Sequence, residues 1–495
     1  MAVDTSPPPA RRAGSASLKR EIGLIGLLWA SVGSIIGSGW LFGAQRALVA
    51  AGPAAIISWV IGGIAILLLG LVHAELGAMY PLSGGSARFP HYAFGGIAGA
   101  GFGWFSWLQA VTVAPIEVSA MIGYLTHWSF AKHWLKPDQT LTHTGLVVAI
   151  LIMAVMTVVN FAGVKVLAQT NSAMTWWKVA VPIFAMLVVV FHGLHGSNFH
   201  AANGFSPDGA HGILLAVAGS GIIFSYLGFE QADQLAGESA NPKRDIPFAV
   251  IGSIVIGLII YLALQVVFLL ALPASAIGTT WNSTAGHAFG NFTGPWADLA
   301  GVIGLGWLST LLRIDAVISP GGTGLIYLAA GSRVSYGLAR NKYFNSVFEL
   351  LNSGRVPWVG VLTSFIAGCV CFLPFPSWQS LVGLITSASV LMYAGAPLSL
   401  GAFRKRLPNA ERPWALPGSS VISPLAFIVA SLIIVWTGWD IDKKLGILII
   451  LGCLLIFNRE FKPGHMRWQS AVWLPVYLIG LGVIVYISDF GPTKV

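Results

Sequence analysis

The amino-acid sequence predicts an all-α protein that crosses a membrane many times and has two interrupted helices. Of its 495 residues, 56% are hydrophobic and only 9% are charged, whereas a soluble domain typically carries about 25% charged residues. Apolar runs long enough to cross a bilayer recur along the chain, and two of them contain glycine and serine near their middle. The composition therefore excludes an ordinary soluble protein.

Thirteen apolar runs are predicted to be membrane spans. Their approximate ranges are 22–50, 54–80, 97–127, 145–162, 173–192, 212–237, 246–272, 299–330, 358–374, 378–402, 422–439, 444–458 and 469–488. The run 444–458 is short for a crossing, which needs about 20 residues. Residues 1–20 are rich in Pro, Ala and Ser and are expected to form a disordered cytoplasmic tail.

The basic residues predict how the chain is oriented. If the N-terminus is cytoplasmic, most Lys and Arg residues fall in inner segments, while the outer loops 193–211 and 273–298 contain none. This asymmetry follows the positive-inside rule. We expect a multi-pass protein of the plasma (inner) membrane, and we attribute its net charge of +9 to the inner loops rather than to nucleic-acid binding.

The first span is interrupted by residues 33–39, which read Gly-Ser-Ile-Ile-Gly-Ser-Gly. Each Gly costs a helix about 1 kcal/mol relative to Ala. In lipid, a backbone without its helical partners is tolerated only where it is buried in protein or lines a cavity. These residues are therefore predicted to form a break whose N–H and C=O groups hold a ligand.

The sixth span has a second interruption at residues 224–230, which read Phe-Ser-Tyr-Leu-Gly-Phe-Glu. Interrupted helices at matching positions of two halves indicate a transport site near the middle of the membrane, between inverted repeats. The alternative is that the glycines only permit close helix packing.

Three segments resemble the amino acid–polyamine–organocation (APC) transporters, and more closely their proton-coupled amino acid permeases. They are the GxxxGxG pattern of residues 33–39, residues 74–85 after the second span, and residues 237–247 after the sixth. The end of the sixth span and residues 314–320 look most like aspartate–proton symporters. The resemblance implies alternating access and a LeuT-like fold with an inverted five-helix-repeat core and broken first and sixth helices. It places the two repeats at 21–192 and 212–405, followed by two or three extra helices within 421–490.

By this resemblance, the two breaks are expected to bind an amino acid. N–H groups at the start of a half-helix suit its carboxylate, and carbonyl groups at the end of another half-helix suit its ammonium. The expected substrate-binding residues are Ser34, Ile35, Gly37, Ser38, Gly39, Phe224, Ser225, Tyr226 and Leu227. Phe224 or Tyr226 is a candidate aromatic gate, with ordinary helix packing as the alternative.

Lys178 in the fifth span is a candidate proton-coupling residue, because a buried ammonium is costly and by default functional. Its position looks like that of the lysine that replaces sodium in proton-coupled members of the family. Carbonyl groups of the first break and the hydroxyls of Ser319 or Thr323 are its expected partners, and a snorkelling lysine is the alternative. Glu230 looks like a proton-sensing glutamate of the family, or else it only ties loose backbone.

Other charged residues lie within or beside the predicted spans. Glu117 and Asp315 are further intramembrane carboxylates, and Arg313 either pairs with a carboxylate on another span or attracts an acidic substrate. Inner charge pairs that open and close are expected among Glu75, Arg88, Glu238 and Arg244, with a static cluster as the alternative. The histidines and the three cysteines lack metal-site spacing, so neither a metal ion nor a cofactor is expected.

These observations predict a secondary active transporter that imports an amino acid together with a proton, with acidic amino acids among the candidates. The alternative within the class is an amino acid or polyamine exchanger without net proton flow. The sequence has no HExxH, GxSxG or Walker motif, and its longest loops leave no room for a signalling domain. An enzyme and a membrane nutrient receptor are therefore disfavoured.

Overall fold

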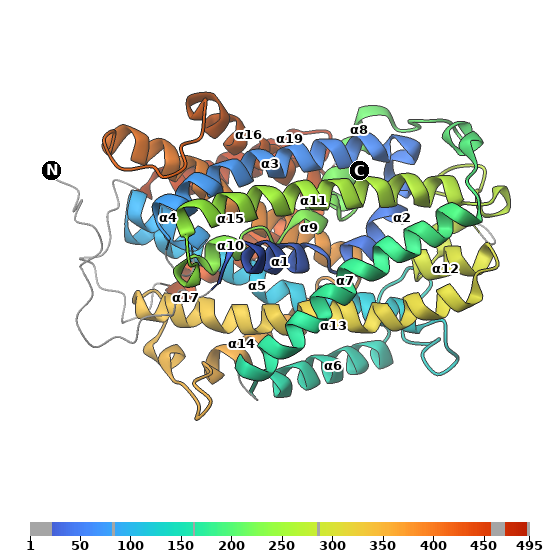
Figure 1. The fold of residues 1–495 in the computed structure, drawn as a ribbon, viewed down its shortest axis with the longest axis horizontal. Coiled ribbons are helices and arrows are strands. Elements are labelled where there is room, and N and C mark those ends of the chain that lie inside the picture. Colours follow the sequence, from blue (N-terminus) through green and yellow to red (C-terminus); the bar gives the residue numbers. More distant parts are fainter. Residues whose placement is uncertain (1–21, 82–84, 162–163, 285–287, 457–470, 493–495) are drawn as a thin grey trace.

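A computed structural model describes residues 22–81, 85–161, 164–284, 288–456 and 471–492. Within these ranges the chain is helical, with isolated β-bridges and no β-strand. The helices run mostly along the longest axis of the molecule (Figure 1). Seven helical stretches of the described chain are long and apolar enough to cross a membrane, which agrees with the predicted all-α membrane architecture.

Two successive groups of helices form the core, and a third group follows them. The first group is α1 (Leu24–Ile35), α2 (Gly39–Ala51), α3 (Ala55–Met79), α4 (Gly85–Phe94), α5 (Gly96–Leu125), α6 (His143–Phe161) and α7 (Val164–His192). The second is α8 (Gly209–Gly219), α9 (Ile222–Tyr226), α10 (Gln231–Gln234), α11 (Pro242–Ala271), α12 (Pro295–Val302), α13 (Gly306–Arg340), α14 (Trp358–Cys371) and α15 (Trp378–Arg406). The third is α16 (Ser419–Thr437), α17 (Trp439–Ile456) and α19 (Trp473–Ile487).

The first and sixth spans are broken, as the sequence predicts. The first ends as α1 at Ile35 and resumes as α2 at Gly39. The sixth is interrupted twice, once between α8 and α9 and again between α9 and α10. Gly228 in the second of these gaps has φ +119°, and a Cβ atom added there would lie 2.7 Å from the Ser34 carbonyl carbon. Only glycine allows both this conformation and this approach of the two breaks.

Corresponding helices of the two halves pack against each other. The second helix of one half, α3, lies against its counterpart α11, and the same holds for α5 with α13 and for α6 with α14. The broken helices also meet, since α1 contacts α10 while α2 contacts α8 and α9. Figure 1 shows α1 and α9 near the middle of the bundle. This pairwise arrangement is the one expected of a LeuT-like core built from two inverted repeats.

Several helices differ from the predicted spans at their ends. The short helix α4 was not predicted, because its sequence is polar and contains Pro90. The predicted span 299–330 is two helices, since the chain turns at Gly304, where φ is +84°, before α13 begins. Helix α7 begins before the predicted start at 173, and α17 is an 18-residue helix that begins at Trp439 rather than at 444.

The end of the bundle at which α1 begins, called the inner face below, is closed by ion pairs and backbone contacts. The fully buried Glu75 carboxylate on α3 accepts hydrogen bonds from Arg404 Nε and Nη2 at 3.1 and 2.6 Å, and Arg412 Nε lies 3.3 Å from it. The chain just before α1 pairs with the segment after α10, because Ile22 N donates to the Glu238 carbonyl. The partners of Glu75 thus come from the end of α15 and the segment after it, and not from the set predicted for it.

Candidate functional site

The break in the first span points its free N–H group at a carboxylate. Ser38 N donates to both oxygens of Glu117, at 3.0 and 3.3 Å. Ser38 is the residue before α2, where helical N–H groups lack partners and the helix dipole favours negative charge. Glu117 lies on α5 and is fully buried. Its carboxylate therefore sits at the position predicted for the carboxylate of a bound amino acid.

Gly37 brings three helices together at the break. A Cβ atom added at Gly37 would lie 2.8 Å from Glu117 Oε1 and 3.4 Å from Thr323 Oγ1. The loose backbone between α1 and α2 is therefore in contact with α5 on one side and with α13 on the other. Glycine at this position lets both polar side chains approach the backbone.

Lys178 on α7 closes the other side of the break. Its Nζ donates to the Gly33 carbonyl at 3.3 Å and to Thr323 Oγ1, so the contacts predicted for it are present. The side chain is fully buried, which excludes a lysine that snorkels to the membrane surface. Glu117 on α5 and Lys178 on α7, an acidic and a basic residue, therefore contact the first break from two different helices.

A row of oxygen atoms on α13 extends from this cluster. Asp315, Ser319 and Thr323 are spaced by four residues and share one face of the helix. Asp315 Oδ1 accepts hydrogen bonds from Ser319 Oγ at 2.5 Å and from Trp177 Nε1 at 2.7 Å. Of the two hydroxyls predicted to contact Lys178, Thr323 makes the hydrogen bond and Ser319 binds Asp315 instead.

Glu230 holds the break in the sixth span. Its Oε2 accepts from Gly228 N at 2.9 Å and from the Tyr393 hydroxyl at 2.7 Å, and its Oε1 accepts from Gln109 Nε2 at 3.0 Å. These contacts match the alternative in which Glu230 ties loose backbone. They are also compatible with a group that exchanges a proton, and that role stays a prediction.

The other residues predicted in the first break differ in what they contact. Gly39 approaches Ser225 of the sixth span closely. The Ser34 hydroxyl donates to the Ala30 carbonyl of its own helix at 2.9 Å. The Ile35 carbonyl accepts from the Tyr261 hydroxyl at 2.8 Å. The two breaks therefore touch at Gly39, while the end of α1 is held by α11.

The residues predicted in the sixth span divide into two groups. Phe224 meets the ring of Trp378 edge-on, with the ring centroids 6.0 Å apart. Tyr226 instead donates to the Trp59 carbonyl at 3.2 Å and packs against the rings of Trp59 and Tyr261. Of the two gate candidates, Phe224 lies beside Trp378 and Tyr226 makes packing contacts. The remaining contacts, Ser225 Oγ to the Gly221 carbonyl and Leu227 N to the Phe224 carbonyl, are local.

Trp378 separates the first break from a cavity on the side of the bundle away from the inner face. Its Nε1 donates to Ser38 Oγ at 3.0 Å, and its ring stacks on Phe42 at 4.7 Å. The same two aromatic rings line a cavity of about 470 Å³. We call this space the outer cavity. Its position makes the aromatic pair the partition between the cavity and the break.

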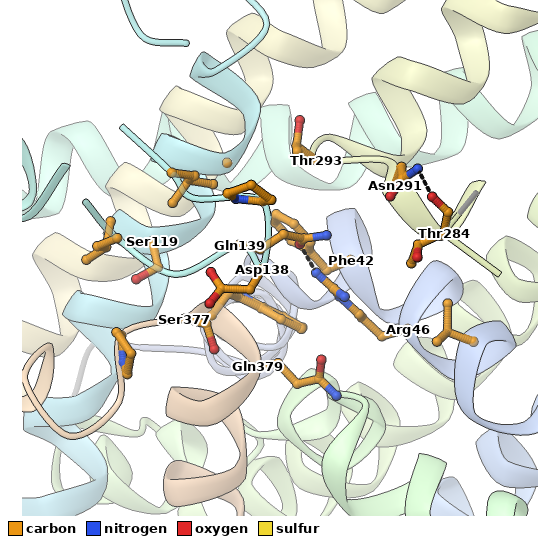
Figure 2. A pocket seen from close by; sticks show the side chains of 18 residues that line it. Phe42, Arg46, Ser119, Asp138, Gln139, Thr284, Asn291, Thr293, Ser377 and Gln379 are labelled. Carbon is orange, nitrogen blue, oxygen red and sulfur yellow. Dashed lines mark hydrogen bonds between the residues drawn. The ribbon is translucent and has the colours of Figure 1, made fainter. Parts of the chain in front are cut away.

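The outer cavity carries one cation and one anion (Figure 2). Arg46 on α2 donates to Gln139 Oε1, and its Nε is buried without a hydrogen-bond partner in the described chain. Asp138 accepts from the hydroxyl and the backbone N–H of Thr140. These hydrogen bonds lower the pKa of the Asp138 carboxyl, so it is negatively charged at neutral pH.

Sequence reasoning gave no role to three residues that the structure places at the site. Glu117 was noted as an intramembrane carboxylate, but nothing in its own helix indicated that it would face Ser38. Arg46 is a charged residue within an apolar run, which is a signal for function. Trp378 has no such signal, because tryptophan at the end of a span is common.

Arg313 lies outside this cluster. Its Nη2 forms an ion pair with Asp298 Oδ1 at 2.6 Å, and its Nη1 donates to the Tyr124 carbonyl at 3.3 Å. The contacts support pairing with a carboxylate, but that carboxylate lies in α12, just before the start of the same predicted span, and not on another span as predicted.

Comparison with known proteins identifies the family. The model of a family described as amino acid permease matches residues 22–488. The chain is 36% identical to the glutamate/serine transporter AimA of Bacillus subtilis over 483 residues, which cover 95% of this chain and 88% of that protein. It is 34% identical to the aspartate-proton symporter of Bacillus subtilis over 482 residues, which cover 96% of this chain and 91% of that protein. The branched-chain amino acid permease BcaP of Bacillus subtilis is 24% identical over 92% of this chain and 97% of its own length.

The extent of these matches confirms the resemblance found in the three short segments of the sequence. The fold has the two broken helices that the resemblance implies, and the family model matches nearly the whole chain. The chain belongs to the amino acid permease family of the APC transporters, and it is an amino acid transporter that crosses a membrane several times.

Proposed function

We propose that the protein is a secondary active transporter that imports an amino acid together with a proton by alternating access. One observation carries this proposal: Glu117 and Lys178 flank the first break, and Glu117 accepts the Ser38 N–H that the carboxylate of a substrate needs. Two ionised carboxylates at one site repel each other, so one of them is favoured in the protonated form. A proton on Glu117 therefore favours the binding of a substrate carboxylate at Ser38.

The predicted site residues have separate roles in this mechanism. Ser38 and Gly39 bind the substrate carboxylate, and Phe224 covers the substrate together with Trp378. The remaining predicted substrate-binding residues shape the two breaks, and they are Ser34, Ile35, Gly37, Ser225, Tyr226 and Leu227. Lys178 and Thr323 lie next to the first break and take part in proton coupling. Ser319 orients Asp315. Glu230 responds to protonation at the second break.

An acidic amino acid is the substrate that we favour. Two relatives carry the names glutamate/serine transporter and aspartate-proton symporter. In the outer cavity, Arg46 and Asp138 offer one positive and one negative group, which fits a zwitterion on its way to the breaks. The unpartnered Nε of Arg46 suits the additional carboxylate of an acidic side chain.

The proposal also specifies how the protein is oriented in the membrane and which parts of it move. The protein lies in the plasma membrane with a cytoplasmic N-terminus, so the inner face meets the cytoplasm and the outer cavity faces outward. The repeats at 21–192 and 212–405 move against each other. Opening of the ion-paired inner face then alternates with opening of the aromatic partition formed by Phe42 and Trp378.

Purified protein in liposomes tests the proposal directly. We expect an inwardly directed proton gradient alone to drive accumulation of radiolabelled aspartate or glutamate in liposomes that contain no amino acid. A competition panel of acidic, neutral and basic amino acids then ranks the substrates. Uptake that requires amino acid inside the liposomes would instead identify an exchanger without net proton flow.

Replacing Lys178 with alanine is expected to abolish accumulation driven by the proton gradient. The change removes one partner from a buried cluster of ionisable and polar groups. Removing one partner of a buried ion pair lowers the free energy of unfolding by about 3–5 kcal/mol. The measurement is initial uptake with and without the gradient. Lys342→Ala is the matched control, because that lysine is exposed and pairs with Glu349 at the surface. Gradient-driven uptake that survives in Lys178→Ala removes this residue from the mechanism.

Replacing Glu117 with glutamine is expected to make substrate binding insensitive to pH. In the wild-type protein, binding should weaken as the pH rises, because ionised Glu117 competes for Ser38 N–H. Glutamine keeps the size of the side chain but cannot ionise. Equilibrium binding of the substrate across a range of pH checks this, with the surface variant Glu349→Gln as control. A pH dependence equal to that of the wild type contradicts the competition.

Replacing Arg46 with glutamine is expected to raise the KM for aspartate and glutamate by about tenfold with little change in kcat. A charge-assisted hydrogen bond contributes about 1.5–3 kcal/mol, and 1.4 kcal/mol corresponds to a tenfold change in affinity. The KM for neutral amino acids should change less. Lys136→Gln is the control, because Lys136 does not line the outer cavity. Equal changes for acidic and neutral substrates would show that Arg46 does not select them.

A further inference from the structure

A second buried carboxylate lies on the inner side of the broken sixth span and takes no part in the contacts described above. Asp233 belongs to the short helix α10, three residues after Glu230 and thus about one helical turn away. Its side chain is fully buried. Neither of its oxygen atoms has a hydrogen-bond partner in the part of the chain that the structure describes.

The Asp233 carboxyl group lies against the backbone of a neighbouring helix. Helix α10 packs against α1, α3, α4 and α11. On α3, a Cβ atom added at Gly77 would collide with Asp233 Oδ1 and lie 2.8 Å from the Ile246 side chain of α11. Helix α1 contains no titratable residue. The absence of a side chain at Gly77 is therefore what leaves room for Asp233.

The elements packed against α10 carry several charged and titratable groups. They are His73 and Glu75 on α3, Arg88, His91 and Tyr92 on α4, Lys243, Arg244, Asp245 and Tyr261 on α11, Glu238 after α10, and Glu230 before it. His73 bonds through Nδ1 to the Leu69 carbonyl, and its Nε2 has no hydrogen-bond partner in the described chain. Glu75 is held by Arg404 and Arg412, and Lys243 by Glu411. None of the ion pairs in the described chain includes Asp233. The nearby group that acts on it electrostatically is Glu230, which is also acidic.

Such surroundings favour a neutral side chain. An isolated ionised carboxylate away from water is far more costly than a protonated one, and the acidic neighbour Glu230 opposes ionisation further. No basic group of the described chain compensates Asp233. In this closed conformation the carboxyl group therefore holds its proton.

We propose that Asp233 is a proton-binding site that is loaded while the inner face is closed and releases its proton to the cytoplasm when that face opens. The proposal rests on the proton-coupled import proposed above. The backbone contacts that close the inner face begin a few residues after Asp233, where Ile22 pairs with Glu238 and Ala240. When these contacts part, water reaches α10, the carboxyl O–H bond breaks, and water accepts the proton while Asp233 becomes a carboxylate.

Release of the proton from Asp233 couples the opening and closing of the inner face to proton transport. The ionised carboxylate cannot return to its dry position next to Gly77 without a large cost. The inner face therefore closes again only after Asp233 has taken up a proton, or after a partner for its charge has arrived. This makes Asp233 a positioning residue for the closed state and a proton carrier for the cycle.

Infrared spectroscopy of the purified full-length protein in lipid tests the protonation itself. The wild type is expected to show the C=O stretching band of a protonated carboxyl group at neutral pH, and Asp233→Asn is expected to lose that band. Asp440→Asn is the control, because the exposed Asp440 carboxylate pairs with Lys443, which lowers its pKa, so its loss should leave the band unchanged. A spectrum in which Asp233→Asn loses no protonated-carboxyl band overturns the proposal.

Transport in liposomes tests the link to the proton. Asp233→Asn, which keeps the shape of the side chain, is expected to retain substrate binding and exchange of internal for external amino acid while losing accumulation driven by a proton gradient. Asp233→Glu restores an ionisable group and should recover part of that accumulation. If Asp233→Asn does not fold, Asp233→Glu and the surface control Asp440→Asn are compared with the wild type. Only Asp233→Glu should then shift the pH dependence of uptake.

These outcomes separate the two proposals. Gradient-driven accumulation by the wild type together with undiminished accumulation by Asp233→Asn, or an unshifted pH profile in Asp233→Glu, would overturn the role of Asp233 and leave proton-coupled import intact. Failure of the wild type itself to respond to a proton gradient would overturn the proposed function.

Discussion

The constraint on which the site depends is that backbone polar groups inside a membrane must find partners within the protein. Each unsatisfied N–H or C=O group in hydrocarbon costs several kcal/mol. The break at residues 36–38 removes the helical partners of the neighbouring groups, and ionisable or hydroxyl side chains replace them. Glu117 accepts the Ser38 N–H, Lys178 donates to the Gly33 carbonyl, and the Tyr261 hydroxyl donates to the Ile35 carbonyl. The need to satisfy loose backbone thus gathers ionisable groups around the place where we propose that the substrate binds.

The same arrangement recurs at the second break, and the two breaks are in contact. Glu230 accepts the Gly228 N–H much as Glu117 accepts the N–H of Ser38. Gly228 lies against the Ser34 backbone, and Gly39 lies against Ser225. Because these contacts involve glycines without side chains, the two broken helices approach at backbone distance. Neither broken helix can therefore shift without displacing backbone atoms of the other.

The broken helices could be predicted from the sequence because their signal is local. Glycine and serine in the middle of an apolar run conflict with a continuous helix, and the conflict is visible without knowledge of the neighbouring helices. The contacts of Lys178 could be inferred for the same reason, since one charged residue in an apolar span needs a polar partner. The choice of Thr323 rather than Ser319 as that partner depends on the rotation of α13 about its axis, which no local pattern encodes.

Other parts of the site depend on the packing of distant segments and were outside the reach of the sequence. Glu117 faces Ser38 only because α5 crosses the first break. Trp378 reaches the Ser38 hydroxyl from 340 residues further along the chain. The bounds of α12 and α13 were wrong because a short turn at Gly304 leaves the apolar run unbroken in composition. Helix α4 was missed because its sequence contains no apolar stretch long enough to mark a span.

The carboxylate at the start of α2 also has a consequence for small inorganic ions. The positive end of a helix attracts any anion, so an empty site with a bare Ser38 N–H would offer a place to chloride or phosphate at the centre of the membrane. Glu117 fills that place with a carboxyl group that is part of the protein and cannot diffuse away. The Ser38 N–H is therefore not available to a free anion in this conformation, which disfavours an anion leak through the site.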